Sequence, residues 1–195
     1  MNNDNSKRSI NNLTWQMAVT AILLAICIGS QFLKNLSVYI TGPIINLCLV
    51  IAVMTVGVWW AAVLAVVTPV RAFLITASPV MQMVPAIIPM IMIGNAILVA
   101  ASYYFFKPSF LAAGEKIAVK NAVIAVCACL AKALFMGLVI SLWLLPAYVP
   151  EGTPLREKLP VFQMTFSVTQ FVTAAIGFVY FYLIWKPVSK MVDKR

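Results

Sequence analysis

Six long apolar segments constrain the fold of this chain more than any other feature. A helix that spans a bilayer needs roughly 20 consecutive, mostly apolar residues. Of the 195 residues, 63% are hydrophobic and only 10% are charged, far less charge than a soluble domain carries. The sequence therefore predicts an all-α integral membrane protein, with one six-helix membrane domain over residues 1–195. The expected spans are Leu13–Leu33, Val38 or Pro43 to Gly57, Trp59–Thr76, Val80–Phe106, Ala118–Leu145 and Val161–Trp185.

Segment length decides two further points near the start of the chain. The apolar run from Ile44 to Ile75 is too long for one span, so we expect the chain to turn back near Gly57. The first apolar segment is too long for a signal-peptide core and lacks a small-residue cleavage site. We therefore expect a retained helix that follows a polar tail of residues 1–12.

The distribution of Lys and Arg predicts how the helices are oriented, because short cytoplasmic loops carry an excess of these residues. An even number of helices places both termini on one side. That side holds nine Lys and Arg, whereas the other holds Lys34, Arg156, Lys158 and the helix-end Arg71. Both termini are therefore expected in the cytoplasm, and residues 146–160 are expected to form a long outer loop. The nine residues are Lys7, Arg8, Lys107, Lys116, Lys120, Lys186, Lys190, Lys194 and Arg195.

Composition disfavours several classes of function. The net charge of +9 lies at membrane boundaries rather than in one patch, so we expect no nucleic acid partner. Cys127 and Cys129 would point to nearly opposite faces of a helix, and the chain has no His. We therefore expect no metal site and no cofactor. No Gly-rich Lys-Ser/Thr loop is present to hold ATP phosphates, so active transport would need a separate ATPase.

Arg71 and Lys132 are the most informative charges, because an ionisable residue within a span is costly and usually functional. A rise of about 1.5 Å per residue places both in the outer half of the membrane. No Asp or Glu occurs in any expected span, which suggests that an anionic ligand supplies the counter-charge. Two alternatives stay open: snorkelling to the outer interface, and contact with backbone carbonyls released by nearby prolines.

Prolines and four amide side chains gather in the same half of the membrane, whereas Asn95 is expected deeper, past the middle of the fourth span. Pro69 lies in the third span, and Pro79, Pro85 and Pro89 lie in the fourth. Broken helices near a substrate site are common in transporters, and simple packing kinks are the alternative. Together with several methionines, these features predict a cavity that is open to the outside and closed below. The candidate binding residues are Arg71, Lys132, Gln170, Asn46, Gln82, Gln163 and Asn95.

Two spans present small residues at four-residue spacing, which places them on one face of a helix. Small residues let membrane helices pack closely. The spacing alone leaves open whether the packing partner is this chain or another protein. The residues are Ala21, Ala25 and Gly29 in the first span, and Ala133, Gly137 and Ser141 in the fifth.

Three local marks accompany this layout: the Ala21-x-x-x-Ala25 pair, a proline-rich fourth helix leading to Gly94-Asn95, and the stretch TQFVTAAIG in the sixth helix. In these marks, and in its length, six helices and lack of an ATPase motif, the chain resembles the substrate-binding S components of energy-coupling factor (ECF) vitamin transporters. The resemblance covers nearly the whole chain.

The resemblance implies an S component that captures a vitamin or related micronutrient at the outer face of a prokaryotic cell membrane. It implies that loops over the pocket, notably the one after the first helix, act as a gate. Ala21 and Ala25 would dock on a transmembrane T component, which two cytoplasmic ATPase subunits drive while the S component topples in the bilayer. We extend this docking face to Gly29 from its spacing.

The resemblance does not specify the cargo. Two buried cations favour a carboxylate or phosphate, and pantothenate, folate and lipoate fit. The absence of His argues mildly against His-ligated haem or metal cargo, and a cobalamin-type or queuosine-precursor cargo stays open. The alternative function is a membrane scaffold or channel-like subunit without a substrate. An intramembrane enzyme is disfavoured because the spans hold no His or carboxylate for acid–base chemistry.

Overall fold

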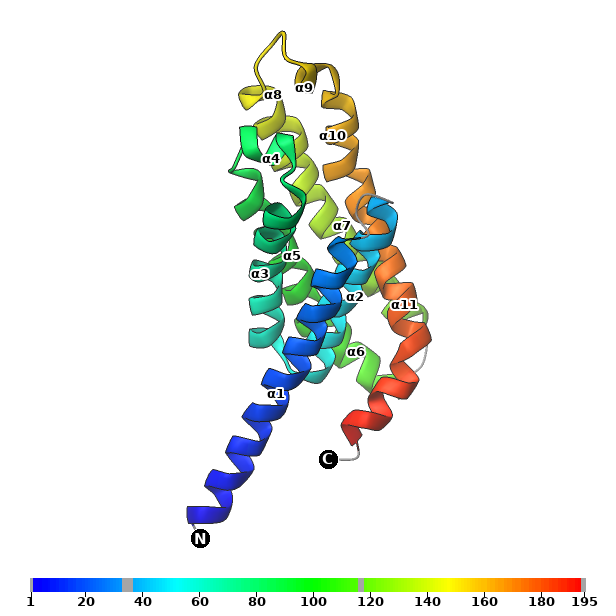
Figure 1. Ribbon diagram of the computed structural model, residues 1–195. Coiled ribbons are helices and arrows are strands. Elements are labelled where there is room, and N and C mark those ends of the chain that lie inside the picture. The colour runs from blue at the N-terminus through cyan, green and yellow to red at the C-terminus, as the bar shows by residue number, and fades with distance from the viewer. Residues whose placement is uncertain (1, 33–36, 116–117, 194–195) are drawn as a thin grey trace.

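The chain forms a bundle of long helices in the computed structural model, which describes residues 2–32, 37–115 and 118–193 (Figure 1). These residues contain no strand. Six helical segments are long and apolar enough to cross a membrane, which confirms the expected all-α class and number of spans. The segments are Asn12–Gln31, Val38–Thr55, Val58–Thr76, Ile87–Ala112, Val119–Tyr148 and Leu159–Met191.

The first three spans are single helices, and the last three are compound. The single helices are α1 (Asn2–Gln31), α2 (Val38–Thr55) and α3 (Val58–Thr76). The fourth span joins α5 (Ile87–Ala101), the π-helical η1 (Ser102–Phe106) and α6 (Lys107–Ala112). The fifth joins α7 (Val119–Met136), the π-helical η2 (Gly137–Leu144) and α8 (Leu145–Tyr148). The sixth joins α10 (Leu159–Phe166) and α11 (Val168–Asp193), whereas α4 (Pro79–Met83) and α9 (Pro154–Glu157) lie between spans.

Local chemistry explains where the second and third spans begin. The Ser37 hydroxyl accepts a hydrogen bond from the Tyr39 N–H at 3.0 Å and caps α2, so Pro43 lies inside this helix. Gly57 separates α2 from α3 with a φ of +94°, a conformation that glycine adopts at little cost. The turn therefore lies where segment length predicted it.

Two expected helices are interrupted, which corrects their predicted bounds. The fourth expected helix, Val80–Phe106, is broken between Met83 and Ile87, because Pro85 disfavours a helical conformation at Val84. The sixth, Val161–Trp185, is broken at Ser167, whose φ of −119° and ψ of −88° are not helical. Both breaks lie in the half of the bundle away from the termini.

Both termini lie at one end of the bundle, and α4, α8 and α9 lie at the other (Figure 1). A large apolar core joins α2, α3 and α11 and includes stacked and edge-on rings of Phe106, Phe110 and Phe181 near the terminal end. There the Lys107 ammonium donates to the Val53 and Met54 carbonyls at 3.0 and 3.3 Å, which satisfies the last carbonyls of α2. A smaller core joins α4, α10 and η2.

Candidate ligand-binding cavity

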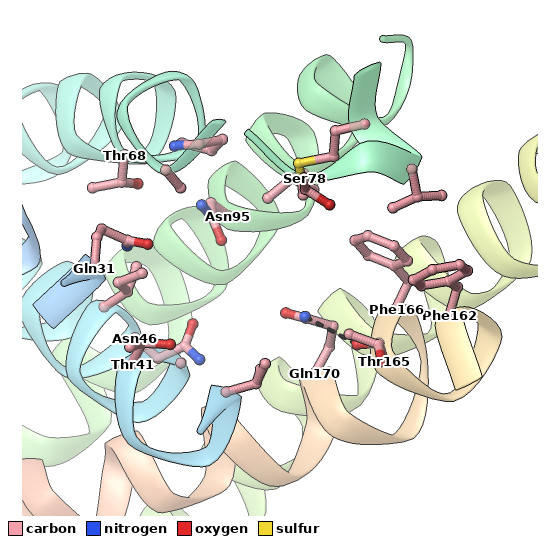
Figure 2. Close-up of a pocket in the computed structure, with 18 of the residues that line it drawn as sticks. Gln31, Thr41, Asn46, Thr68, Ser78, Asn95, Phe162, Thr165, Phe166 and Gln170 are labelled. Carbon is pink, nitrogen blue, oxygen red and sulfur yellow. Dashed lines mark hydrogen bonds between the residues drawn. The ribbon is translucent and has the colours of Figure 1, made fainter. Parts of the chain in front are cut away.

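A cavity of about 320 Å³ lies among the halves of the spans that are far from the termini, and all six spans contribute to its wall. Its volume falls at the lower end of the range for small-molecule sites, roughly 300–1,000 Å³. Figure 2 shows that its walls differ in chemistry. Gln31, Asn46, Thr68 and Asn95 lie on one side, whereas the rings of Phe162 and Phe166 lie on the other, beside Thr165 and Gln170.

Lys132 of α7 is the charged residue of this wall and is only 2% exposed. Its ammonium donates hydrogen bonds to Asn46 Oδ1 at 2.6 Å and to Asn95 Oδ1 at 2.9 Å. An ammonium group is a donor only, so both amides must turn their oxygens toward it. The contacts join α2, α5 and α7, three spans that are distant in the sequence.

A proline in α3 orients Asn95. Pro69 has no N–H, so it leaves the carbonyl four residues earlier, that of Ala65, without its helical partner. The Asn95 amide nitrogen donates to this carbonyl at 3.4 Å, and its oxygen then faces Lys132. Gly94 allows α5 to pack closely against α7, because a Cβ there would lie 2.7 Å from Met136 Cγ on α7. Pro69 of α3 therefore has a direct role in building the site.

Close packing of α2 against α11 positions Asn46. A Cβ at Gly177 would lie 2.9 Å from the Asn46 Cβ and 3.1 Å from the Pro43 carbonyl oxygen. A Cβ at Gly42 would meet the Thr173 side chain at 2.7 Å. Because both glycines lack side chains, the two helices approach closely enough to fix the Asn46 backbone beside the cavity.

Within the described residues, Lys132 donates to two neutral amides and has no carboxylate partner. Among the described residues, the one ion pair is that of Arg156 with Glu151, 3.8 Å apart at the outer 146–160 loop. A buried charge without a counter-ion is costly unless something else compensates it. The cavity that borders Lys132 gives a ligand access to this charge.

Gln31, the last residue of α1, contributes a second unusual group. Its side chain is 4% exposed, and its amide nitrogen has no hydrogen-bond partner in the described structure. Gln31 also lines the cavity. A buried polar group without a partner is uncommon in a native structure, so this donor is available to a ligand.

Four of the seven candidate binding residues line the cavity, namely Lys132, Gln170, Asn46 and Asn95. The other three do not. Arg71 is exposed on α3 and is not part of the cavity lining, although Thr68 and Ala72 of the same helix are. Gln82 is exposed and donates to the Ala77 carbonyl at 3.0 Å, whereas Gln163 donates to the Ser141 carbonyl at 2.9 Å.

Several wall residues had no signal in the sequence. Phe162 and Phe166 look like ordinary apolar residues of a span, and only the break at Ser167 turns their helix toward the cavity. Gln31 could have been found as a polar residue within an apolar segment. The proposed gate after the first helix includes residues 33–36, which lie outside the described residues.

The two small-residue faces differ in what covers them. On α7 and η2, Ala133 is buried, a Cβ at Gly137 would lie 3.2 Å from Ser167 Cβ, and the Ser141 hydroxyl donates to the Gln163 carbonyl at 2.8 Å. This face therefore packs within the chain. On α1, by contrast, Ala21, Ala25 and Gly29 are exposed. A Cβ added at Gly29 would meet nothing within 4 Å.

The fold and cavity define a multi-pass helical membrane protein with a buried cationic site. In the described part of the chain, no three His, Cys, Asp or Glu side chains gather as a metal site. No protein-family model, curated protein or solved structure matches this chain.

Proposed function

We propose that this chain is the substrate-capture subunit of an ATP-driven, ECF-type importer. It binds a small anionic micronutrient from outside the cell and delivers it by docking on a T component with two ATPase subunits. The observation that carries this proposal is the buried Lys132 ammonium, held by two neutral amides at the wall of a ligand-sized cavity.

The orientation that Lys and Arg predict supports capture from outside. With cytoplasmic termini, the cavity lies in the outer half of the bundle, because its wall is built from the span halves far from the termini. The terminal half is filled by the aromatic core around Phe106, Phe110 and Phe181. A site placed in this way receives ligand from the outer side and needs a further step to release it inward.

The uncovered face of α1 supports docking on another membrane protein. Ala21, Ala25 and Gly29 form a smooth stripe that no described residue covers. Helix association in lipid depends on such close packing. In contrast, the comparable face of α7 and η2 is already used within the chain.

Affinity purification of the tagged chain from the cells that make it tests the proposal. We expect a T component and two ATPase subunits to co-purify, and ATP-dependent uptake of the retained small molecule to require the chain. Retention of a ligand without any ATPase, together with uptake that is independent of ATP, would contradict the importer function. Turnover of the retained molecule by the isolated chain would instead indicate an enzyme.

A further inference from the structure

We propose that the cavity takes a ligand with one negative charge: a monocarboxylate with an apolar ring or branched body. Its carboxylate lies at Lys132, and its body lies against Phe162 and Phe166. This inference rests on the proposed function and names the class of ligand that the same site selects.

Charge counting limits the ligand to a monoanion. The described wall holds one cation, Lys132, and no carboxylate. One negative charge neutralises the site, whereas a dianion leaves one excess negative charge in a place of low dielectric. A neutral ligand leaves the ammonium uncompensated. Phosphate esters and dicarboxylates such as folate therefore fit the site poorly.

The hydrogen bonds offered by the polar wall select a group that only accepts. Lys132 has three N–H donors, and two of them already bind Asn46 and Asn95. Because the Asn46 oxygen faces Lys132, its amide nitrogen is turned away from the ammonium. The buried Gln31 nitrogen adds a donor without a partner. This wall offers N–H donors and has no carboxylate of its own that could accept a hydrogen bond from a ligand. It therefore matches a ligand with an ionised carboxylate, which only accepts.

The opposite wall selects the rest of the ligand. Phe162 and Phe166 face Gln31, Asn46 and Asn95 across the cavity (Figure 2). Thr165 and Gln170 lie beside these rings, but the Thr165 hydroxyl already donates to the Val161 carbonyl at 2.7 Å and the Gln170 amide nitrogen to the Thr165 carbonyl at 3.2 Å. A hydroxyl-rich body placed against the two rings would lose hydrogen bonds to water that the rings cannot replace. The volume of about 320 Å³ further restricts the ligand to one of small size.

A matched probe series tests this inference with the full chain in lipid nanodiscs. Phenylbutanoate carries one charge and an apolar ring, phenylbutanamide replaces the charge, and benzylsuccinate and phenylpropyl phosphate carry a second negative charge at similar size. We expect phenylbutanoate to bind at least about tenfold more tightly than each of the others, measured by titration calorimetry. Equal binding of the amide, tighter binding of a dianion, or no binding of any probe at about 1 mM overturns the inference.

Two variants test the role of Lys132, so that the test still works if one of them fails to fold. Lys132→Met removes the charge and should weaken phenylbutanoate binding by at least about a hundredfold. Asn46→Asp keeps the size of the side chain but supplies an internal counter-ion to Lys132, so it should cause a similar loss. Lys158→Met, at an exposed cation outside the cavity, is the matched control and should bind normally. An Asn46→Asp chain that folds and binds phenylbutanoate like the parent overturns the charge argument.

The small molecule retained by the purified chain separates this inference from the proposed function. If the retained molecule is a dianion or is neutral while the ATPase subunits co-purify, the importer function stands and the inference fails. If it is an apolar monocarboxylate but no ATPase co-purifies, the inference stands and the importer function fails. Mass spectrometry of the extracted molecule distinguishes the two cases.

Discussion

At the scale of single residues, the cavity depends on positions where a side chain is missing as much as on those that carry polar groups. Gly177 lies where α11 crosses α2, and a methyl group there would lie 2.9 Å from the Asn46 Cβ. That contact is closer than carbon atoms tolerate, and the neighbour is a Cβ fixed to the backbone rather than the end of a flexible side chain. Relief therefore requires the helices to move apart.

Gly177→Ala should lower the free energy of unfolding by about 1–3 kcal/mol, because overpacking at a tight crossing displaces backbone. It should also weaken ligand binding, since Asn46 moves with α2. Gly29→Ala is the matched control, because a Cβ there meets no atom within 4 Å. Thermal unfolding in detergent compares the stability of the two variants. Equal unfolding midpoints would show that the α2–α11 crossing is looser than the structure indicates.

The same scale shows what the sequence could not decide about the site. Depth counting found Lys132, Asn46 and Asn95, because depth follows from position along a span. It also selected Arg71, which has a suitable depth but is exposed and does not line the cavity. Which face of a helix lines the cavity depends on the neighbouring helices. These spans carry apolar residues on every face, so the sequence pattern does not mark the inner one. The depth of the site in the membrane could therefore be predicted from the sequence, but the helix faces that line it could not.

At the scale of elements, the irregular helices explain why the polar groups meet. Pro69 interrupts the hydrogen bonds of α3, and the released Ala65 carbonyl accepts from Asn95. The breaks between Met83 and Ile87 and at Ser167 leave α4 and α10 as separate helices at the cavity wall. Six spans and the turn at Gly57 followed from segment length, whereas these breaks did not. A proline marks where a helix is weakened, but packing decides whether it bends or ends.

Pro69→Ala should restore the helical hydrogen bond to the Ala65 carbonyl and remove the acceptor that orients Asn95. We expect the chain to stay folded, while affinity for phenylbutanoate falls by roughly threefold to tenfold, which corresponds to the loss of about one hydrogen bond. Pro187→Ala, at an exposed proline within α11 and outside the cavity, is the control. Titration calorimetry compares the variants. Unchanged affinity after Pro69→Ala would mean that Asn95 is held by Lys132 alone.

At the scale of the whole molecule, the cavity and the face of α1 divide two tasks between separate surfaces. Gln31 ends α1 at the cavity, whereas Ala21 and Ala25 lie exposed farther along the same helix. Binding should therefore be separable from delivery by mutation. A scaffold or channel-like subunit has no reason to show this separation, so it distinguishes the proposed function from its alternative.

Ala25→Leu should abolish uptake of the retained micronutrient while leaving its binding within about twofold of the parent chain. A bulky side chain prevents close approach of a partner helix but touches no wall residue of the cavity. Ala122→Leu, at an exposed alanine of α7, is the matched control and should transport normally. Uptake into cells and ligand binding to the purified variant are measured together. Loss of both in Ala25→Leu would show that this face supports the fold of the chain itself, and normal uptake would show that the T component docks elsewhere.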